Sequence, residues 1–174
     1  MDEIEIVGYD PTWPKLFEAE AAAIVSALPA GMVLRIDHFG STAVPGLAAK
    51  PVIDILIAVP SVPAARDPCV AALKHLDYVF WAENPRTDRL FFVKGMPPYG
   101  VRRTHHVHVR EADALHRRDL AFRDLLRAQP ETARRYETLK RDLARRFSSD
   151  REAYTQAKTE FIDGALGVEW SPDP

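Results

Sequence analysis

The sequence has little of two features that would place it in a specialised class of protein. It contains one cysteine, Cys69, among 174 residues. No disulfide can therefore form within the chain, and a reducing compartment is the expected location. It also has no strong excess of either charge, since 23 Lys and Arg residues face 25 Asp and Glu residues. Nucleic-acid-binding proteins are usually basic, so we do not expect nucleic acid as a partner.

Long apolar runs are absent as well. No stretch approaches the roughly 20 residues that a helix needs to cross a bilayer, and the acidic start, Met1 to Tyr9, is unlike a signal peptide. We therefore expect a soluble, cytoplasmic protein with no membrane partner. The composition, 47% hydrophobic and 28% charged residues, is that of a globular protein. The length suits one domain over residues 1–174, with 170–174 as a loose tail.

Periodicity and turn residues predict an α/β (α+β) protein, a mixed β-sheet flanked by helices with a helical C-terminal half. Helical spacing predicts helices over 14–28 and 63–76, and later from about 113 to 129. A further helix begins at Pro130, and the last runs from a capping box at Ser149–Glu152 to about Leu166. Strands are predicted over 32–39, 51–59, 78–81, 90–93 and 104–110.

Asp54 is the sharpest anomaly in this pattern. It is the only charge in residues 52–59, an apolar and β-branched run typical of a central strand buried on both faces. A carboxylate in such a strand is costly unless it is paired, hydrogen-bonded or bound to a metal. Two interpretations follow. Asp54 forms a structural ion pair, or the strand aims it into a cleft as a metal ligand or general base.

A turn of small residues precedes the Asp54 strand. Gly40, Ser41 and Thr42 directly follow a predicted strand, and small residues let backbone N–H groups approach an anion closely. Lys50 adds a cation at the far end of the same loop. A Gly-Ser turn is common, but one followed after about a dozen residues by a buried strand with an aspartate is rare. The combination favours a phosphate-binding site.

Two histidines offer candidate partners for Asp54. In the predicted strand over 104–110, His106 and His108 point to one face and His105 to the other. With Asp54 as a third ligand, the pair can hold Zn²⁺ or Mn²⁺. The same histidines can instead bind phosphate or act as acid or base near neutral pH. The alternative is that they are ordinary surface or hydrogen-bonded histidines.

Several cations are candidates for binding phosphate. Arg89 and Lys94 bracket an apolar strand, and Arg103 comes just before the histidines. If these strands adjoin the aspartate, they deliver positive charge to one edge of the site. On the last helix, Tyr154 and Lys158 lie one turn apart on one face. Either they line the cleft or they belong to an ordinary helix surface.

The run from His38 to Ile55 closely resembles the signature of the GrpB family. The matching segments extend from Val7 to about Gly167 and include Tyr9–Pro14, His105–Val109, Phe122–Asp124 with Leu126-Arg127, and Tyr154 with Lys158 and Phe161-Ile162. The resemblance implies a nucleotidyltransferase-like fold. It also implies a link to coenzyme A metabolism, because similar domains occur fused to dephospho-CoA kinases.

One position departs from the pattern of that superfold. Its nucleotidyltransferases follow Gly-Ser with a strand that bears two carboxylates one residue apart. These and a third carboxylate hold two Mg²⁺ ions. Here Leu56 occupies the second position, and the neighbouring strand offers His106 or His108 instead of a carboxylate. Such a site can bind one Mg²⁺ or Mn²⁺ ion, use a softer metal such as Zn²⁺ through histidine, or only bind a nucleotide.

Three functions are therefore in competition. The first is a nucleotidyltransferase-type protein that acts on a nucleotide or CoA-like phosphate compound, with a divalent metal on Asp54 and His108 and no organic cofactor. The second is a non-catalytic nucleotide-binding or accessory domain, which Leu56 favours. The third is a metal-dependent hydrolase that uses Asp54, His106 and His108. In each case the expected partner is a phosphate-bearing small molecule.

Overall fold

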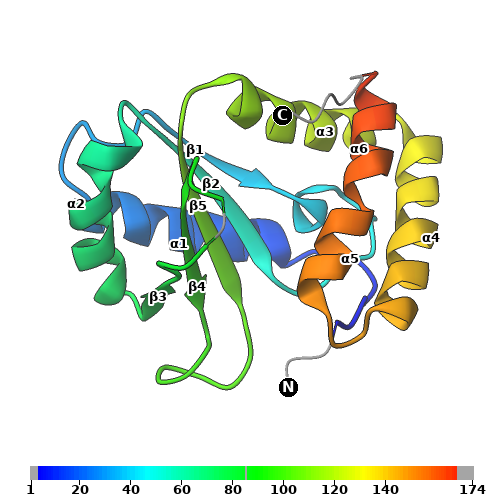
Figure 1. The fold of residues 1–174 in the computed structure, drawn as a ribbon, viewed down its shortest axis with the longest axis horizontal. Helices are drawn as coiled ribbons and strands as arrows, with labels where there is room; N and C mark the ends of the chain where they lie inside the picture. The colour runs from blue at the N-terminus through cyan, green and yellow to red at the C-terminus, as the bar shows by residue number, and fades with distance from the viewer. Residues whose placement is uncertain (1–3, 85, 168–174) are drawn as a thin grey trace.

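A five-stranded mixed sheet forms the centre of the protein (Figure 1). The computed structural model describes residues 4–84 and 86–167. The strand order is β1-β2-β5-β4-β3, in which β2 and β5 are parallel and the other neighbouring pairs are antiparallel. The strands are β1 Arg35–Phe39, β2 Ile53–Val59, β3 Tyr78–Phe80, β4 Leu90–Lys94 and β5 His105–Glu111.

Helices flank this sheet and make up the C-terminal half of the chain. Their bounds are α1 Trp13–Ala27, the 3₁₀ helix η1 Ser41–Ala43, α2 Val62–Lys74, α3 Ala114–Ala128, α4 Pro130–Arg146, α5 Arg151–Ala157 and α6 Thr159–Leu166. The predicted mixed α/β fold with a helical C-terminal half is confirmed. In the part of the chain that the structure describes, no helix combines the length and the apolar character that crossing a membrane requires.

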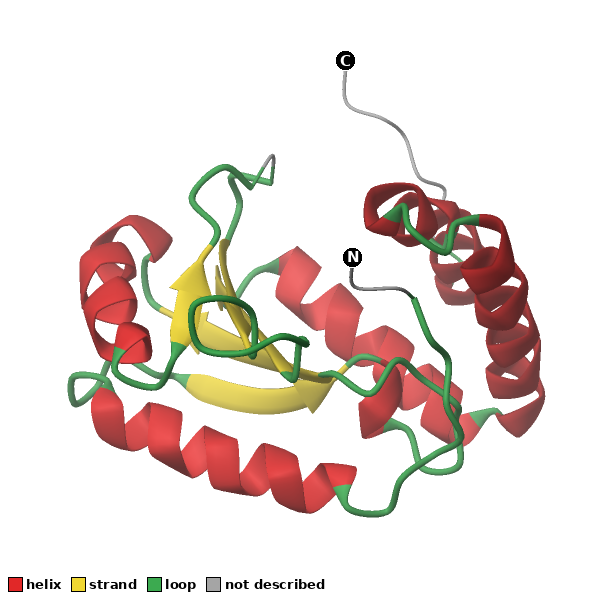
Figure 2. Ribbon diagram, turned by 90° about the horizontal axis from the view of Figure 1, so that it is seen from below, coloured by secondary structure: helices red, strands yellow, loops and turns green. Residues whose placement is uncertain are grey.

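The two faces of the sheet have different partners. Figure 2 shows α1 along one face and the C-terminal helices on the opposite side. On the α1 face, alternate residues of the two central strands form the middle of the largest apolar core, and each is at most 2% exposed: Ile53, Ile55, Ile57, Val107 and Val109. Each such side chain contributes about 1.5–3 kcal/mol of burial free energy. Side chains alternate along a strand, so Asp54, His106 and His108 lie on the other face.

The last predicted helix is divided in two and begins differently from the prediction. Helix α5 ends at Ala157, and α6 starts after Lys158. The N-cap of α5 is Asp150, whose carboxylate accepts a hydrogen bond from the Ala153 N–H at 3.0 Å. The predicted capping box at Ser149 is therefore wrong by one residue, because Asp150 has the extended backbone that lets a strong capping side chain reach back. The predicted loose tail over 170–174 lies outside the described residues.

Candidate functional site

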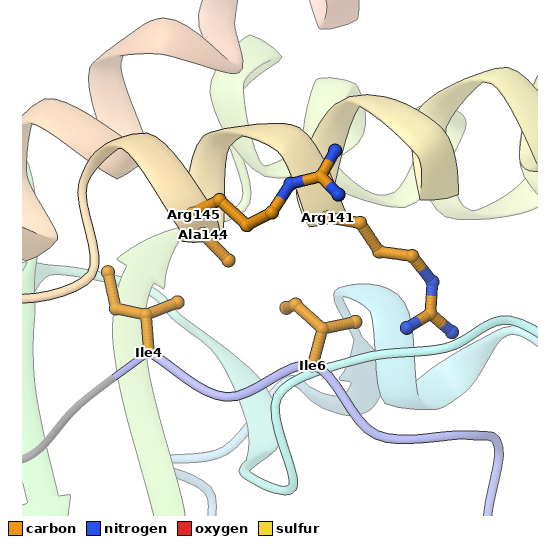
Figure 3. Close-up of a pocket in the computed structure, with 5 residues that line it drawn as sticks. All are labelled: Ile4, Ile6, Arg141, Ala144 and Arg145. Carbon is orange, nitrogen blue, oxygen red and sulfur yellow. The ribbon is translucent and has the colours of Figure 1, made fainter.

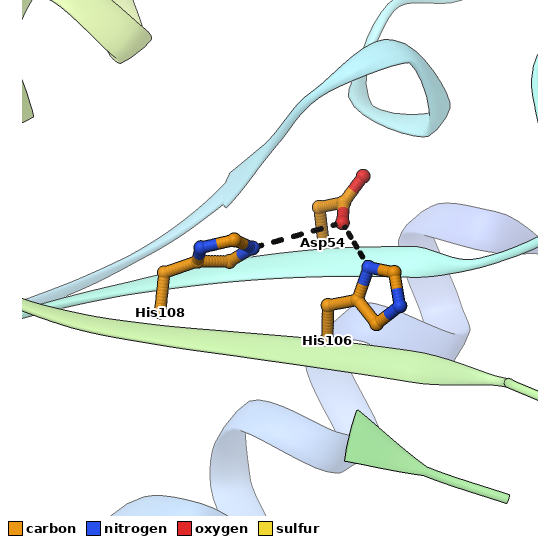
Figure 4. Close-up of side chains that lie close together, drawn as sticks. All are labelled: Asp54, His106 and His108. Atoms are coloured by element: carbon orange, nitrogen blue, oxygen red, sulfur yellow. Dashed lines mark hydrogen bonds and ion pairs between the residues drawn. The ribbon is translucent and has the colours of Figure 1, made fainter. Parts of the chain in front are cut away.

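Asp54, His106 and His108 meet on the face of the sheet that lies opposite α1. The register of the parallel β2–β5 pair places Asp54 beside His106. His106 Nδ1 lies 3.0 Å from Asp54 Oδ1, and His108 Nε2 lies 4.0 Å from the same oxygen (Figure 4). One potential ligand atom from each residue lies within 4.8 Å of the other two. Their side chains are 26%, 10% and 12% exposed, so a small ligand can reach them.

The surroundings hold Asp54 ionised and both imidazoles neutral. Burial raises the pKa of Asp54, but the hydrogen bond from His106 and nearby positive charge, including Lys50, outweigh it and hold that pKa well below its usual range. Burial lowers the pKa of His106 although its bond to Asp54 opposes the change. Burial and the charge of Arg89 lower the pKa of His108 further. An ionised carboxylate and neutral imidazoles are the forms that bind metal ions.

The donor set fits one ion of Zn²⁺ or Mn²⁺ type better than a pair of Mg²⁺ ions. Imidazole nitrogen suits transition metals, whereas Mg²⁺ prefers an octahedron of oxygens. Leu56, two residues after Asp54 on the same strand, is fully buried and offers no second carboxylate. Among the described residues, no further carboxylate joins the cluster. Because Asp54 is ionised, the shared proton lies on His106 Nδ1, and metal binding there requires that His106 give up this proton.

Aromatic side chains fix the orientation of the two imidazoles. The ring centroid of Phe91, on β4, lies 5.2 Å from that of His106 and 4.7 Å from that of His108. The Phe39 ring on β1 makes an edge contact with His108 at 5.1 Å. His106 Nε2 and His108 Nδ1 are buried without a hydrogen-bond partner among the described residues. Packing, rather than a second carboxylate, therefore sets the ring positions.

The Gly40 turn lies directly against Asp54. Gly40 has a φ of +69°, which favours glycine, and a Cβ atom there would lie 2.6 Å from Asp54 Oδ2. Two arginines of α3 anchor the turn from the other side. Arg123 Nη1 donates to the His38 carbonyl oxygen at 2.9 Å, and Arg127 Nη2 donates to the Ala43 carbonyl oxygen at 2.7 Å. The sequence pattern contained both arginines but indicated no role for them.

Three lysines approach the site from the helical half and from the loop before β2. Lys50 Nζ and Lys158 Nζ lie 5.2 Å and 4.4 Å from the Tyr154 ring centroid. Burial, followed by the charge of Lys50, lowers the pKa of Lys158 to about 7, although Asp54 acts in the opposite direction. Lys140 is 2% exposed, and its Nζ donates to the Ala48 carbonyl oxygen. The sequence did not indicate Lys140 as a site residue, because a lysine in a helix rich in charged residues is expected to be exposed to solvent.

Comparison with known proteins identifies the family. The family model described as GrpB protein matches residues 3–167. The chain belongs to the GrpB family. A UPF0157 protein of Pseudomonas aeruginosa is 55% identical over an alignment of 171 positions, which covers 95% of this chain and 67% of that protein. The crystal structure of the conserved protein GrpB from Enterococcus faecalis superposes with a TM-score of 0.79 at 33% identity, over 94% of this chain and 98% of that one.

A more distant relative carries an enzyme name. The dephospho-CoA kinase of Mycolicibacterium paratuberculosis is 33% identical over an alignment of 192 positions, which covers 96% of this chain but only 46% of that protein. The GrpB-like part is therefore less than half of the kinase.

Not every predicted phosphate ligand reaches the GrpB site. Arg89 and Arg103 are close enough to the histidines to lower the pKa of His108 and His106 respectively. Lys94 is on the α1 face of β4, where its Nζ lies 2.8 Å from the Glu20 carboxylate. Strand alternation explains this position, because the register pairs Lys94 with His105.

The hydroxyl groups of the predicted phosphate turn are also partly engaged. Thr42 is 1% exposed, and its Oγ1 lies 3.0 Å from His38 Nε2. The Ser41 hydroxyl is hydrogen-bonded to Tyr136, whose pKa is raised mainly by burial. Thr42 therefore holds the turn together, and the half-buried Ser41 and Gly40 are its parts nearest to solvent.

A shallow cavity of about 310 Å³ lies elsewhere, between the N-terminal segment and α4 (Figure 3). Ile4, Ile6 and Ala144 give it an apolar floor, and Arg141 and Arg145 border it. Both guanidinium groups already pair with carboxylates one turn away, on Glu137 and Asp142. The cavity therefore offers little uncompensated charge to an anionic ligand.

His38, under the Gly40 turn, makes stability depend on pH. Its ring stacks on Phe17 with centroids 4.8 Å apart, and burial lowers its pKa to about 4. In the unfolded chain the pKa is about 6.5, so on acidification the unfolded state binds a proton first. The free energy of unfolding should therefore fall by about 2–3 kcal/mol between about pH 7.5 and about pH 4.5 through His38 alone.

The variant His38→Gln tests this expectation. Glutamine can hydrogen-bond to Thr42 but cannot take up a proton, so urea unfolding should show a flatter acid limb than that of the wild type. The other histidines are common to both proteins and cancel in the difference. Identical pH profiles for the two proteins would contradict a buried neutral His38.

Proposed function

We propose that this GrpB protein binds a phosphate-bearing small molecule, a nucleotide or CoA-like compound, beside a divalent metal, and catalyses a nucleotidyltransferase-type reaction. The observation that carries the proposal is the cluster of Asp54, His106 and His108, whose potential ligand atoms lie within 4.8 Å of one another. It lies against the glycine turn and faces the lysines of the helical half. An ionised carboxylate, neutral imidazoles and nearby cations together match what phosphoryl-type transfer requires.

The residues of the chain divide this work between them. Asp54, His106 and His108 would hold the metal ion, which when bound supplies a Lewis acid next to the reacting phosphate. Lys50 and Lys158 neutralise phosphate charge from the helical side, and Arg89 does so from the strand side. Gly40, which has no Cβ, leaves the ligand room to approach Asp54. Phe91 and Phe39 keep the imidazoles in place, so little reorganisation is needed when the ligand binds.

The kinase relative supports the substrate class but not the reaction. The name dephospho-CoA kinase belongs to a protein of which this chain covers 46%. A GrpB-like segment joined to such an enzyme is consistent with a ligand built on a CoA-like or nucleotide phosphate. We therefore place dephospho-CoA, 4′-phosphopantetheine and the common nucleoside triphosphates first in a substrate screen.

Metal-dependent hydrolysis is the second candidate, and one observation favours it. Leu56 takes the place of a second carboxylate, and a metal site with two histidines and one aspartate can activate water. The reaction products distinguish transfer from hydrolysis when purified protein is incubated with Mn²⁺ or Zn²⁺ and each compound of the substrate screen. Pyrophosphate release that depends on an acceptor supports transfer, and phosphate release without an acceptor supports hydrolysis. Binding without either product, and unchanged in Asp54→Asn, would indicate a non-catalytic nucleotide-binding module.

Lysine variants test the phosphate subsite directly. Lys50→Gln and Lys158→Gln should each weaken the binding of inorganic triphosphate about tenfold, because each removes one charge from a partly buried anion site. Isothermal titration calorimetry near pH 6.5 measures the change, since Lys158, with a pKa of about 7, is then mostly charged.

Lys94→Gln provides the matched control for these variants. It removes the same charge from the opposite face of the sheet, where Lys94 pairs with Glu20. Its affinity for triphosphate should equal that of the wild type. An equal loss of affinity in all three variants would show that net charge, rather than a subsite, governs binding.

A further inference from the structure

An aromatic row extends from the metal cluster to the edge of the sheet. The row begins at Phe91 on β4, whose ring contacts the rings of both His106 and His108. The ring of Trp81, the residue after β3, lies 5.7 Å from that of Phe91, and the Trp81 N–H donates to the Phe91 carbonyl oxygen at 2.9 Å. Trp81 therefore continues the wall of the site outward from the imidazoles.

Trp81 is exposed in a way that a core tryptophan is not. It is 47% exposed, whereas Phe91 beneath it is 7% exposed and Trp13 in the core is 3% exposed. Phe91 is thus already buried, whereas the indole of Trp81 presents a broad apolar surface to solvent near the polar cluster of Asp54, His106 and His108. Arg86 and Arg89 follow in the same loop, and both charges act on His108.

The spacing across the sheet suits a ligand with an aromatic end and a phosphate end. Neighbouring strands are about 4.8 Å apart, so two strand spacings, about 10 Å, separate the edge position of Trp81 from the histidine strand. This is of the same order as the length of a nucleoside between its base and its phosphate. The face of an indole ring does not attract a phosphate, but it stacks with any nucleobase.

We propose that Trp81 is a stacking surface for the nucleobase of the ligand, whose phosphates lie toward Asp54 and the lysines. This inference rests on the proposed function and names the substrate class more closely, as a nucleotide rather than a phosphate compound without a base. Because stacking uses the π-face that every base has, Trp81 gives affinity without strong preference among bases.

Binding of ATP and of inorganic triphosphate to the same variants tests the assignment. Trp81→Ala should bind ATP at least about tenfold more weakly than the wild type and triphosphate equally well. Trp81→Phe keeps a stacking ring and should retain most of the ATP affinity. The chain has two other tryptophans, Trp13, which is buried, and Trp170, which lies outside the described residues and is replaced by phenylalanine for this measurement. In that Trp170→Phe background, ATP should quench the fluorescence of Trp81 and triphosphate should not.

Tyr99→Ala is the matched control, since Tyr99 is 43% exposed in the loop at the other end of β4. Its affinity for ATP should stay at the wild-type value. Unchanged ATP binding by Trp81→Ala overturns the stacking role. An equal loss of ATP and triphosphate binding also overturns it, because Trp81 would then act by packing against Phe91. A wild type that binds triphosphate but gains nothing from the base keeps the proposed function and removes this inference, whereas a wild type that binds neither removes both.

Discussion

The Asp54→Asn variant is expected to bind Zn²⁺ or Mn²⁺ at least about a hundredfold more weakly than the wild type. Even residues that only orient a metal ligand contribute 10- to 100-fold to affinity, and Asp54 provides the one negative charge of the cluster. Titration calorimetry on protein first stripped with a chelator measures the change. All metal-dependent turnover should disappear with it.

The stability of Asp54→Asn separates loss of the site from loss of the fold. Asparagine keeps an oxygen that can accept the hydrogen bond from His106, so the metal-free variant should have a urea unfolding midpoint close to that of the wild type.

A pair of histidine variants adds a second test of the site. His105→Gln is the matched control for His106→Gln, because His105 is on the same strand and points to the α1 face. Only His106→Gln should lose metal affinity. Wild-type affinity in Asp54→Asn would place the metal elsewhere.

Gly40→Ala is expected to lower the free energy of unfolding by about 3 kcal/mol and to weaken metal binding at the same time. A side chain at a positive φ of this kind costs about 1–3 kcal/mol. The new methyl group would also stand 2.6 Å from Asp54 Oδ2 and 3.2 Å from Asp54 Cβ. Because the Asp54 side chain is short, it must turn away from the histidines to relieve the contact.

Gly46→Ala isolates the backbone contribution to this effect. Gly46 has a similar φ of +77°, but a Cβ atom there meets nothing within 4 Å. We expect a loss of about 1 kcal/mol in urea unfolding and unchanged metal affinity for this variant. If Gly40→Ala behaved in the same way as Gly46→Ala, the close approach of Gly40 to Asp54 would have no functional meaning.

The sequence predicted the faces of the site better than its assembly. Strand periodicity correctly placed His106 and His108 on one side of β5 and His105 on the other. It could not place β5 beside β2, because Asp54 and His106 are 52 positions apart and strand order is a property of the whole fold. Lys94 shows the same limit, since the side that a residue at a strand end faces depends on a register fixed by its partner strand.

The helical half was predicted less completely for a related reason. Its apolar stripe and helix starts are local signals, and the helices over 114–128 and 130–146 follow them. The burial of Lys140 depends on the packing of α4 against the loop before β2, where the Ala48 carbonyl oxygen accepts the Lys140 hydrogen bond. Nothing in the sequence singled out Trp81, because a tryptophan at the end of a strand is expected in the core unless its exposure is known.

The parallel pairing of β2 with β5 has a consequence for how the protein folds. Two strands so distant in sequence meet only when a long loop has closed, which is slow. The proposed metal site does not exist before that event, so an ion bound there would stabilise the closed sheet and not the open chain. If the pair forms after the rate-limiting barrier, added Zn²⁺ slows unfolding and leaves the folding rate unchanged. The ion then reports when the centre of the sheet closes.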